Sequence, residues 1–363
     1  MNNKIQVLVV EDSPAAQLLL VYILNSDARL SVVGTANNGE EALAFLNRNK
    51  PDVIVMDIHM PGMDGFETTR RIMETQPVPI VVCSASLNPA EVARTFRALE
   101  AGAVAAVAKP VGLGHQEYEN MAGKLVETVR LMSEVRVVKR WPRQRQSGAP
   151  TGVIPAAELP TPPGGVKVVA IGTSTGGPPV LQTILAGLPK DFSVPVLIVQ
   201  HIAAGFLPGL VDWLTQTTGF PIHIAAHGDS LLPGHAYLAP DGYHMGLSGF
   251  GKIVLSKQEP ENGLRPAVSY LFRSVAAACG ANAVGVLLTG MGRDGAENLK
   301  ALKDLGAVTI AQDAESSVIH GMPGEAIKLG GATYILSPDK ILVVLAALSA
   351  KKSNQSAPLS RPE

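Results

Sequence analysis

The chain contains 363 residues, more than a single hydrophobic core usually organises, so two domains are expected. Charged residues make up 17% of the sequence and the net charge is -1, so neither nucleic acid nor an anionic membrane is favoured as a partner. Cys83 and Cys279 are the only cysteines, which excludes a disulfide framework and a cysteine-based zinc site and suits a reducing cytoplasm. No apolar run approaches the roughly 18 residues of a membrane helix, and the first one ends at Glu11, too early for a signal peptide. The sequence therefore predicts a cytoplasmic protein without membrane insertion.

Residues 1–132 alternate short β-branched runs with amphipathic runs. Strands are expected at IQVLVV, LSVVGTA, DVIVMDI, PIVVCSA and AVAAVA, with a helical pattern between each pair and a fifth helix over residues 115–132. Five strands interleaved with helices, most of them apolar on both faces, predict a five-stranded, parallel, doubly wound α/β sheet of the flavodoxin-like kind.

Residues 133–165 differ in composition, since they are rich in proline and in basic side chains. Such a segment buries little apolar area and is predicted to be an extended linker. Residues 166–348 then resume an α/β pattern, with strands expected at VKVVAIGT, VPVLIVQ, AVGVLLTG, AVTIAQD and ATYILS. This second domain is predicted to be doubly wound and mainly parallel, with a β-hairpin excursion over residues 221–249. Residues 349–363 are predicted to be a flexible tail.

Acidic and basic side chains stand where the strands of the first domain end. Glu11 and Asp12 follow the first strand, Asp57 the third and Lys109 the fifth, while Ser84 ends the fourth. In a doubly wound sheet these positions line one crevice, where three carboxylates repel one another unless a cation bridges them. Oxygen ligands with open positions suit Mg²⁺, so a metal site is predicted at the three acids, with Asp57 poised to attack a phosphoryl group. The alternative is that each acid caps the helix after it. For Asp12 alone this explanation is as favourable as a metal site, but it does not explain the presence of Lys109.

The segments VLVVEDS, VIVMDIHMPGMDGFE and AVAKP resemble response-regulator receiver domains across residues 4–110. The resemblance implies Asp57 as the phospho-acceptor, Glu11 and Asp12 beside it at a Mg²⁺ site, and Ser84 and Lys109 as the switch pair. It also implies a sensor histidine kinase as the phosphodonor. Receivers usually have an aromatic residue where this chain has Ala106, which leaves the route of the switch signal open.

A glycine-rich turn, GTSTGGPP, begins at Gly172 between a predicted strand and a predicted helix. A phosphate-binding loop needs a lysine that this stretch lacks, and a dinucleotide fingerprint needs an initial G-x-G that is also missing. The stretch matches G-x-S-x-G, in which a strand-to-helix turn exposes a nucleophilic serine, here Ser174. An ordinary N-cap at Ser174 or Thr175 is the competing interpretation.

A nucleophilic serine needs a base and an orienting acid. His201 follows the second predicted strand of this domain and Asp294 follows the third, so both fall at the sheet edge that carries Ser174. Asp294 also begins a capping box with Glu297, which is a structural alternative. The histidines that compete with His201 are mostly in the hairpin excursion, where a surface role is expected: His223, His227, His235, His244 and His320.

Four further segments, AIGTSTGGP, IVQHIAAGF, LLTGMGRDGAENL and ESSVIHGMPGEAIKLG, resemble the catalytic domain of the CheB family of chemotaxis methylesterases. The resemblance implies Ser174 as nucleophile, His201 as general base and Asp294 as orienting acid, without a cofactor. It places Thr175 and Met291 around the substrate carbonyl and its oxyanion. The family usually has an acid where this chain has Ser269, which leaves substrate contacts there open.

The implied activity is hydrolysis of glutamyl methyl esters on methylated chemoreceptors, with deamidation of receptor glutamines as a possible second reaction. Phosphorylation of Asp57 is expected to relieve inhibition by the receiver. Two other classes compete with this hypothesis. A non-catalytic regulator would not explain why Ser174, His201 and Asp294 are all present. A transcription factor is disfavoured because the second half has no basic recognition helix.

Overall fold

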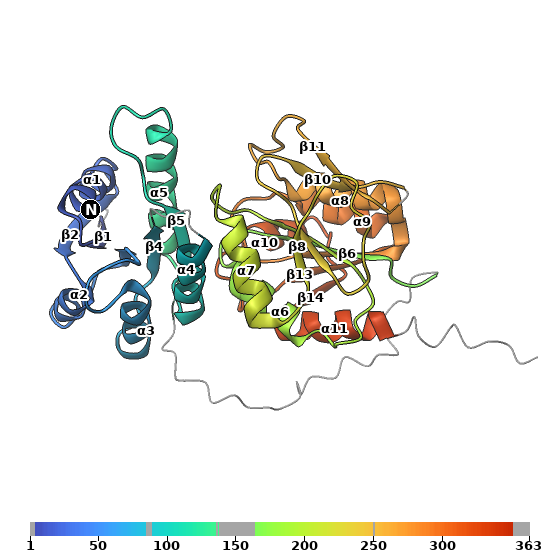
Figure 1. The fold of residues 1–363 in the computed structure, drawn as a ribbon, viewed down its shortest axis with the longest axis horizontal. Coiled ribbons are helices and arrows are strands. Elements are labelled where there is room, and N and C mark those ends of the chain that lie inside the picture. Colours follow the sequence, from blue (N-terminus) through green and yellow to red (C-terminus); the bar gives the residue numbers. More distant parts are fainter. Residues whose placement is uncertain (1–3, 85–88, 136, 138–163, 250, 351–363) are drawn as a thin grey trace, which may run out of the picture. The chain divides into compact units, whose positions relative to one another are not determined.

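The computed structural model describes residues 4–84, 89–135, 137, 164–249 and 251–350, and it divides into two compact units, Met1–Ser147 and Gly148–Glu363 (Figure 1). Most of the predicted linker, residues 133–165, lies outside the described residues, as does nearly all of the predicted tail. In the described part of the chain, no helix has the length and apolar character that crossing a membrane requires.

The first unit is a five-stranded parallel sheet covered by helices on both faces, which confirms the predicted doubly wound fold. In sheet order its strands are β2 (Leu30–Ala36), β1 (Ile5–Val10), β3 (Val53–Met56), β4 (Ile80–Ser84) and β5 (Ala105–Ala108). Helices α1 (Pro14–Asn25) and α5 (Tyr118–Met132) contact each other, and α2 (Gly39–Leu46), α3 (Gly65–Thr75) and α4 (Pro89–Ala101) form the other row.

Local sequence explains where these helices begin. Helix α1 has Pro14 in its first turn, and the Ser13 side chain accepts the Ala16 N–H as N-cap. Helix α3 begins after Asp64, whose carboxylate accepts the Glu67 N–H at 2.8 Å. Of the three strands inside the sheet, β3 and β4 are buried at every residue and β1 at its last four, because helices cover both of their faces.

The second unit is built on a seven-stranded parallel sheet. Its order is β14 (Tyr334–Leu336), β13 (Val308–Gln312), β12 (Ala283–Leu287), β6 (Val168–Thr173), β7 (Val196–Gln200), β9 (Ala236–Leu238) and β8 (Ile222–Ile224). Helices α6 (Gly177–Gly187), α7 (Leu207–Thr218) and α11 (Pro338–Ala350) pack as one layer. Helices α8 (Val268–Cys279), α9 (Ala296–Asp304) and α10 (Met322–Lys328) pack as the other, and a short 3-10 turn, η2 (Gly280–Asn282), follows α8.

The predicted hairpin excursion, residues 221–249, is only partly a hairpin. Strands β10 (His244–Leu247) and β11 (Ile253–Ser256) do form an antiparallel pair. Strands β8 and β9, however, extend the main sheet in parallel, which corrects the sequence interpretation. Each of them is only three residues long, too short for its periodicity to be read, and β9 is buried throughout against the core.

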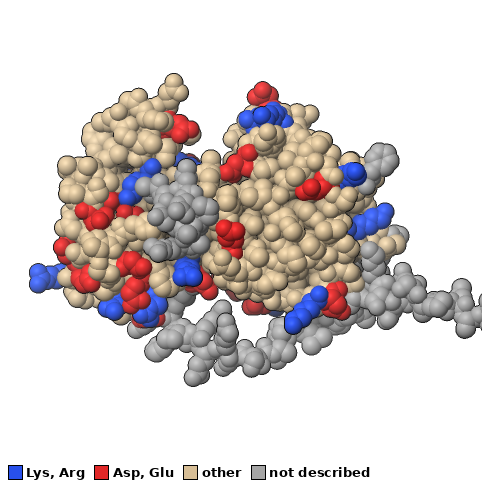
Figure 2. All heavy atoms as spheres, in the orientation of Figure 1, with Lys and Arg blue, Asp and Glu red and all other residues tan. Residues whose placement is uncertain are grey.

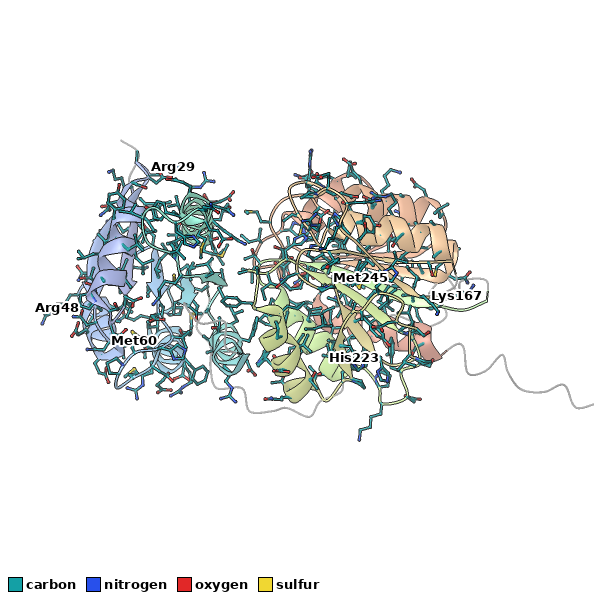
Figure 3. The ribbon with its side chains drawn as sticks, turned by 45° about the horizontal axis from the view of Figure 1, so that its top comes forward. Arg29, Arg48, Met60, Lys167, His223 and Met245 are labelled. Atoms are coloured by element: carbon teal, nitrogen blue, oxygen red, sulfur yellow. The ribbon has the colours of Figure 1, made fainter. Side chains whose placement is uncertain are left out.

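Side chains fill the space between sheet and helices in both units, and Met245 of the hairpin points into the core of the second (Figure 3). On the face shown in Figure 2, acidic and basic side chains are interspersed without a large field of one sign. This mixture agrees with the near-neutral net charge and gives no sign of a nucleic-acid surface on that face.

Candidate active site and acidic pocket

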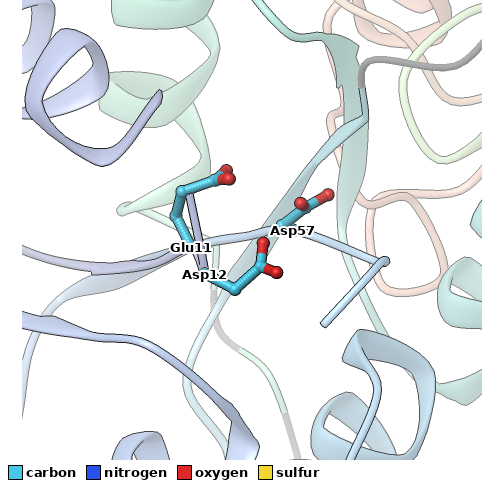
Figure 4. Close-up of side chains that lie close together, drawn as sticks. All are labelled: Glu11, Asp12 and Asp57. Atoms are coloured by element: carbon cyan, nitrogen blue, oxygen red, sulfur yellow. The ribbon is translucent and has the colours of Figure 1, made fainter. Parts of the chain in front are cut away.

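The three predicted acids of the first unit meet at the carboxyl edge of its sheet (Figure 4). Carboxylate oxygens of Glu11, Asp12 and Asp57 all lie within 4.8 Å of one another. Glu11 is 1% exposed and Asp57 5% exposed, whereas Asp12 faces solvent. Asp12 does not cap α1, since Ser13 does so. An oxygen-only cluster with an open, exposed side fits the preferences of Mg²⁺.

Lys109 offsets part of the negative charge of this pocket. Its Nζ lies 2.7 Å from Glu11 Oε2 and 2.9 Å from Asp57 Oδ2. Burial lowers the pKa of Lys109, but its hydrogen bonds and attraction to both carboxylates outweigh burial, and the pKa lies above its ordinary value. For Glu11, burial and the neighbouring Asp57 charge raise the pKa despite the contact with Lys109.

Ser84 completes the pocket from the end of β4. Its hydroxyl is buried and has no hydrogen-bond partner among the described residues, while its carbonyl accepts the Lys109 N–H at 2.8 Å. A buried hydroxyl left without a partner costs free energy, so such a group is normally kept for a ligand or water. On the other side, Gly65 approaches so closely that a Cβ there would lie 2.1 Å from the Asp57 carbonyl oxygen.

Ser174 leaves the second sheet at the end of β6 and opens a tight turn. The Gly177 N–H donates to the Ser174 carbonyl at 2.9 Å, and Gly176 has φ 79° and ψ -2°. These angles define a type II turn, which needs φ above zero at its third residue and therefore favours glycine. No side chain caps α6, so neither Ser174 nor Thr175 is an ordinary N-cap. Both residues are half-buried at the edge of the sheet.

His201 leaves the sheet beside Ser174. Thr173 and Gln200 are paired across β6 and β7, so the next residue of each strand emerges next to the other. The His201 N–H donates to the Thr173 carbonyl at 2.9 Å. Among the described residues, no hydrogen bond joins the Ser174 hydroxyl to the His201 ring, a contact that commonly tightens only when substrate is bound.

Asp294 faces His201 from the loop after β12. Its Oδ2 lies 3.0 Å from His201 Nε2, and its carboxylate accepts the N–H groups of Val268 at 2.6 Å and Ser269 at 3.0 Å. Asp294 is 2% exposed. The capping alternative for Asp294 is wrong, because the N-cap of α9 is Gly295 and no side chain caps it.

His201 and the start of α8 together explain why the pKa of this buried carboxylate is lowered. Burial raises the pKa of Asp294, but the hydrogen bonds from His201, Ser269 and Val268 outweigh it, and the pKa lies below its ordinary value. The positive end of the helix dipole acts in the same direction. Ser269 contributes a second contact, since its hydroxyl accepts the Gly295 N–H at 2.9 Å. Sequence reasoning flagged Ser269 only as a departure from the family pattern.

The loop after β12 also places Met291 near the candidate nucleophile. Met291 is 39% exposed, and a Cβ at the preceding Gly290 would lie 2.7 Å from Ser174 Cβ. The loop is fixed by Thr289, whose carbonyl accepts the Ser174 N–H at 3.0 Å and whose hydroxyl donates to the Thr175 carbonyl at 2.9 Å. Neither Thr289 nor Gln200, both buried, stood out from the sequence.

The competing histidines each have a structural partner. His223 and His235 share a ring hydrogen bond of 2.8 Å, His227 accepts the Leu255 N–H, and His320 Nε2 contacts the Gln312 carbonyl. His244 is buried rather than at the surface as expected, because its two ring nitrogens contact the Glu259 carbonyl and the Ala267 N–H. Among the described residues of this unit, His201 is the one histidine that contacts a buried carboxylate.

Comparison with known proteins identifies a family model for each unit. The family model for the response regulator receiver domain matches residues 7–116, and that for CheB methylesterase matches residues 169–345. A protein-glutamate methylesterase/protein-glutamine glutaminase of Geobacter metallireducens is 56% identical over 96% of this chain and 100% of its own length. A protein of the same name from Nitrosospira multiformis is 53% identical over 96% of this chain and 98% of its own length.

This chain belongs to the CheB methylesterase family. It is also similar to the crystal structure of the Thermotoga maritima CheB methylesterase catalytic domain, at 38% identity over 50% of this chain and 98% of that one, with a TM-score of 0.49. The family, the receiver and the α/β fold class that the sequence predicted are therefore confirmed.

Proposed function

We propose that the chain is a protein-glutamate methylesterase in which Ser174, His201 and Asp294 carry the reaction. The contact between His201 Nε2 and the buried Asp294 carboxylate, at the sheet edge that carries the half-buried Ser174, carries this proposal. The family membership supports the same activity. The substrates are methyl esters of glutamyl side chains on chemoreceptors, and the protein works in the cytoplasm.

The contact with Asp294 decides which ring nitrogen of His201 acts. His201 Nε2 lies 3.0 Å from Asp294 Oδ2, so we assign the ring proton to Nε2, which leaves Nδ1 with a lone pair as the basic nitrogen. Nδ1 takes the Ser174 proton as the Ser174 oxygen attacks the ester carbonyl. The imidazolium then returns this proton to the departing methoxide, and methanol leaves. Asp294 holds the tautomer and stabilises the imidazolium charge.

The acyl-enzyme is then hydrolysed by the same groups. Nδ1 of His201 takes a proton from water, the hydroxide oxygen bonds to the acyl carbon, and the bond to Ser174 breaks as its oxygen regains the proton. The products are the free glutamate side chain and the original enzyme. A glutamine amide follows the same route with ammonia as leaving group, and the names of both relatives include glutaminase activity.

The N–H groups of Thr175 and Met291 are the proposed oxyanion donors. Thr175 directly follows the nucleophile, and Met291 lies on the loop that approaches it. The first turn of α6 adds the positive end of a helix dipole. Donors of this kind stabilise the tetrahedral intermediate and are worth about 100- to 1,000-fold each.

The first unit is the proposed regulatory site. Asp57 accepts a phosphoryl group from a sensor histidine kinase, Glu11, Asp12 and Asp57 hold Mg²⁺, and Ser84 and Lys109 contact the phosphoryl oxygens. Mg²⁺ supplies charge neutralisation when it is bound there. A phosphoryl group withdraws Lys109 from its ion pair with the Asp57 carboxylate, and this rearrangement relieves inhibition of the second unit.

Methanol release from methylated receptor fragments tests the proposal. The wild-type protein is expected to release methanol, and to do so faster with acetyl phosphate and Mg²⁺. Ser174→Ala is expected to release none under either condition. A folded wild-type protein that releases no methanol from any methylated receptor would instead favour a non-catalytic regulator.

A further inference from the structure

Gln200 links the backbone of the nucleophile to that of the base. It is the last residue of β7 and is 5% exposed. Its Nε2 donates to the Ser174 carbonyl at 2.8 Å and to the His201 carbonyl at 2.8 Å. A side-chain amide has two protons on this nitrogen, so each carbonyl receives one. One buried side chain therefore fixes the two chain segments that the proposed reaction needs close together.

The contact with Ser174 has a consequence for the next peptide group. The Ser174 carbonyl and the Thr175 N–H belong to the same peptide, and in a trans peptide the two point in opposite directions. Gln200 Nε2 holds the carbonyl together with the Gly177 N–H of the turn, so the Thr175 N–H points the other way. Within the described part of the chain, no group accepts this N–H. It stands free immediately after the proposed nucleophile.

The following peptide is held in a similar way from the opposite strand. Thr289 donates its hydroxyl to the Thr175 carbonyl at 2.9 Å, and its own N–H donates to Gln312 Oε1 at 2.8 Å. The Thr175–Gly176 peptide is the central one of the type II turn, and its reversal would convert the turn to type I. Gln200, at the end of β7, thus holds the Ser174–Thr175 peptide by a hydrogen bond, and Thr289, in the loop after β12, holds the next one.

We propose that Gln200 is a positioning residue for ester hydrolysis, which orients the Thr175 N–H toward the oxyanion of the tetrahedral intermediate. It takes no part in bond making or breaking and does not touch the substrate. The inference rests on the proposed function, since it assigns a role within that reaction. It adds a residue that the motif of serine, histidine and aspartate does not include.

Gln200→Met tests this role, because methionine keeps the length and volume of glutamine but has no N–H to donate. Gln200→Glu is a second variant, since it keeps the shape and presents an acceptor to both carbonyls. Each is compared with wild type on a peptide carrying a glutamyl methyl ester and on the matching thionoester. Sulfur accepts hydrogen bonds weakly, so the ratio of the two rates reports how much the oxyanion donors contribute.

If the Thr175 N–H is no longer oriented toward the oxyanion, kcat for the oxygen ester is expected to fall about 10- to 100-fold, with KM little changed. The thionoester rate should change much less, so the ratio of oxygen ester to thionoester falls by nearly the same factor. General damage to the fold lowers both rates alike and leaves the ratio unchanged. Gln216→Met, at an exposed position on α7, is the matched control and should behave as wild type.

A wild-type ratio in both Gln200 variants would overturn the inference, whatever their absolute rates. That outcome differs from failure of the proposed function, in which the wild-type protein itself releases no methanol. A ratio that falls in Gln200→Met and Gln200→Glu but not in Gln216→Met supports the inference.

Discussion

At the carboxyl edge of the first sheet two buried carboxylates face one lysine, whereas at the same edge of the second sheet one buried carboxylate faces an imidazole and two backbone N–H groups. Burial penalises the charge in both places. The pKa of Glu11 is raised, because burial and the Asp57 charge outweigh Lys109. The pKa of Asp294 is lowered, because its hydrogen bonds outweigh burial.

This difference indicates what each edge is suited to do. The first pocket holds excess negative charge that a cation can relieve, which favours binding and releasing Mg²⁺ and a phosphoryl group. The second holds a carboxylate that is fully satisfied by the protein and stays charged, which favours holding an imidazole in one tautomer through many turnovers. In the proposed function, similar sheet positions therefore serve a phosphorylation switch in one unit and ester hydrolysis in the other.

The largest expected effect is that of Ser174→Ala, which removes the attacking oxygen from the second edge. Methanol release should fall by about 10,000-fold or more. Thr183→Ala, on the exposed side of the same helix α6, should retain wild-type release. Measurable release from Ser174→Ala above about 1% of wild type would mean that another residue is the nucleophile.

Asp294→Asn tests the satisfied carboxylate of the second edge. An amide keeps the size but favours the wrong His201 tautomer, so kcat should fall by about 1,000- to 10,000-fold. Steady-state methanol release measures this loss. Glu297→Gln, in the first turn of α9, is the control and should have little effect. A loss below tenfold in Asp294→Asn would show that the aspartate is structural.

Asp57→Asn tests the first edge. It should abolish the increase in methanol release that acetyl phosphate and Mg²⁺ produce, an increase expected to be several-fold or more. Rates with and without the phosphodonor measure the response. Glu74→Gln, on the surface of α3, should keep the full response. A full response in Asp57→Asn would place the phospho-acceptor elsewhere.

The smallest effects concern stability, and they have opposite signs at the two edges. The lowered pKa of Asp294 stabilises the fold above the unfolded value of about 3.9, and this contribution is lost as pH falls through the folded pKa. The raised pKa of Glu11 means that its charge destabilises the fold at neutral pH, and this cost disappears as pH falls through the folded pKa toward about 4.3.

Glu11→Gln should therefore stabilise the protein at pH 7, while Asp294→Asn should destabilise it. The difference for Glu11→Gln should shrink as pH falls toward about 4.3, and that for Asp294→Asn should shrink only below about 3.9. Urea unfolding across this pH range, followed separately for each unit, measures them. The same sign for both variants at pH 7 would contradict the electrostatic difference between the two edges.

Much of this arrangement was predictable, because each key side chain directly follows a buried apolar run. Parallel strands end at one edge, so Glu11, Asp57 and Lys109 were expected to meet, and they do. The same reasoning brought His201 and Asp294 together. The five strands predicted in each unit are all present.

The contacts that were missed depend on tertiary structure. The N–H groups of α8 that hold Asp294 lie 25 and 26 residues away in sequence, and no local pattern connects them. Gln200 ends an apolar strand, and its sequence context does not reveal that its side chain bridges two carbonyls. Strands β8 and β9 were missed because three residues do not establish a period.

The most direct test of the central claim is to trap the covalent intermediate. The protein is mixed with a peptide glutamyl methyl ester, quenched in acid during turnover, digested and analysed by mass spectrometry. The account predicts an acyl adduct, the peptide less methanol, on the fragment that contains Ser174, and no adduct in Ser174→Ala. An adduct on a different residue, or steady turnover without any Ser174 adduct under conditions that slow deacylation, would contradict it.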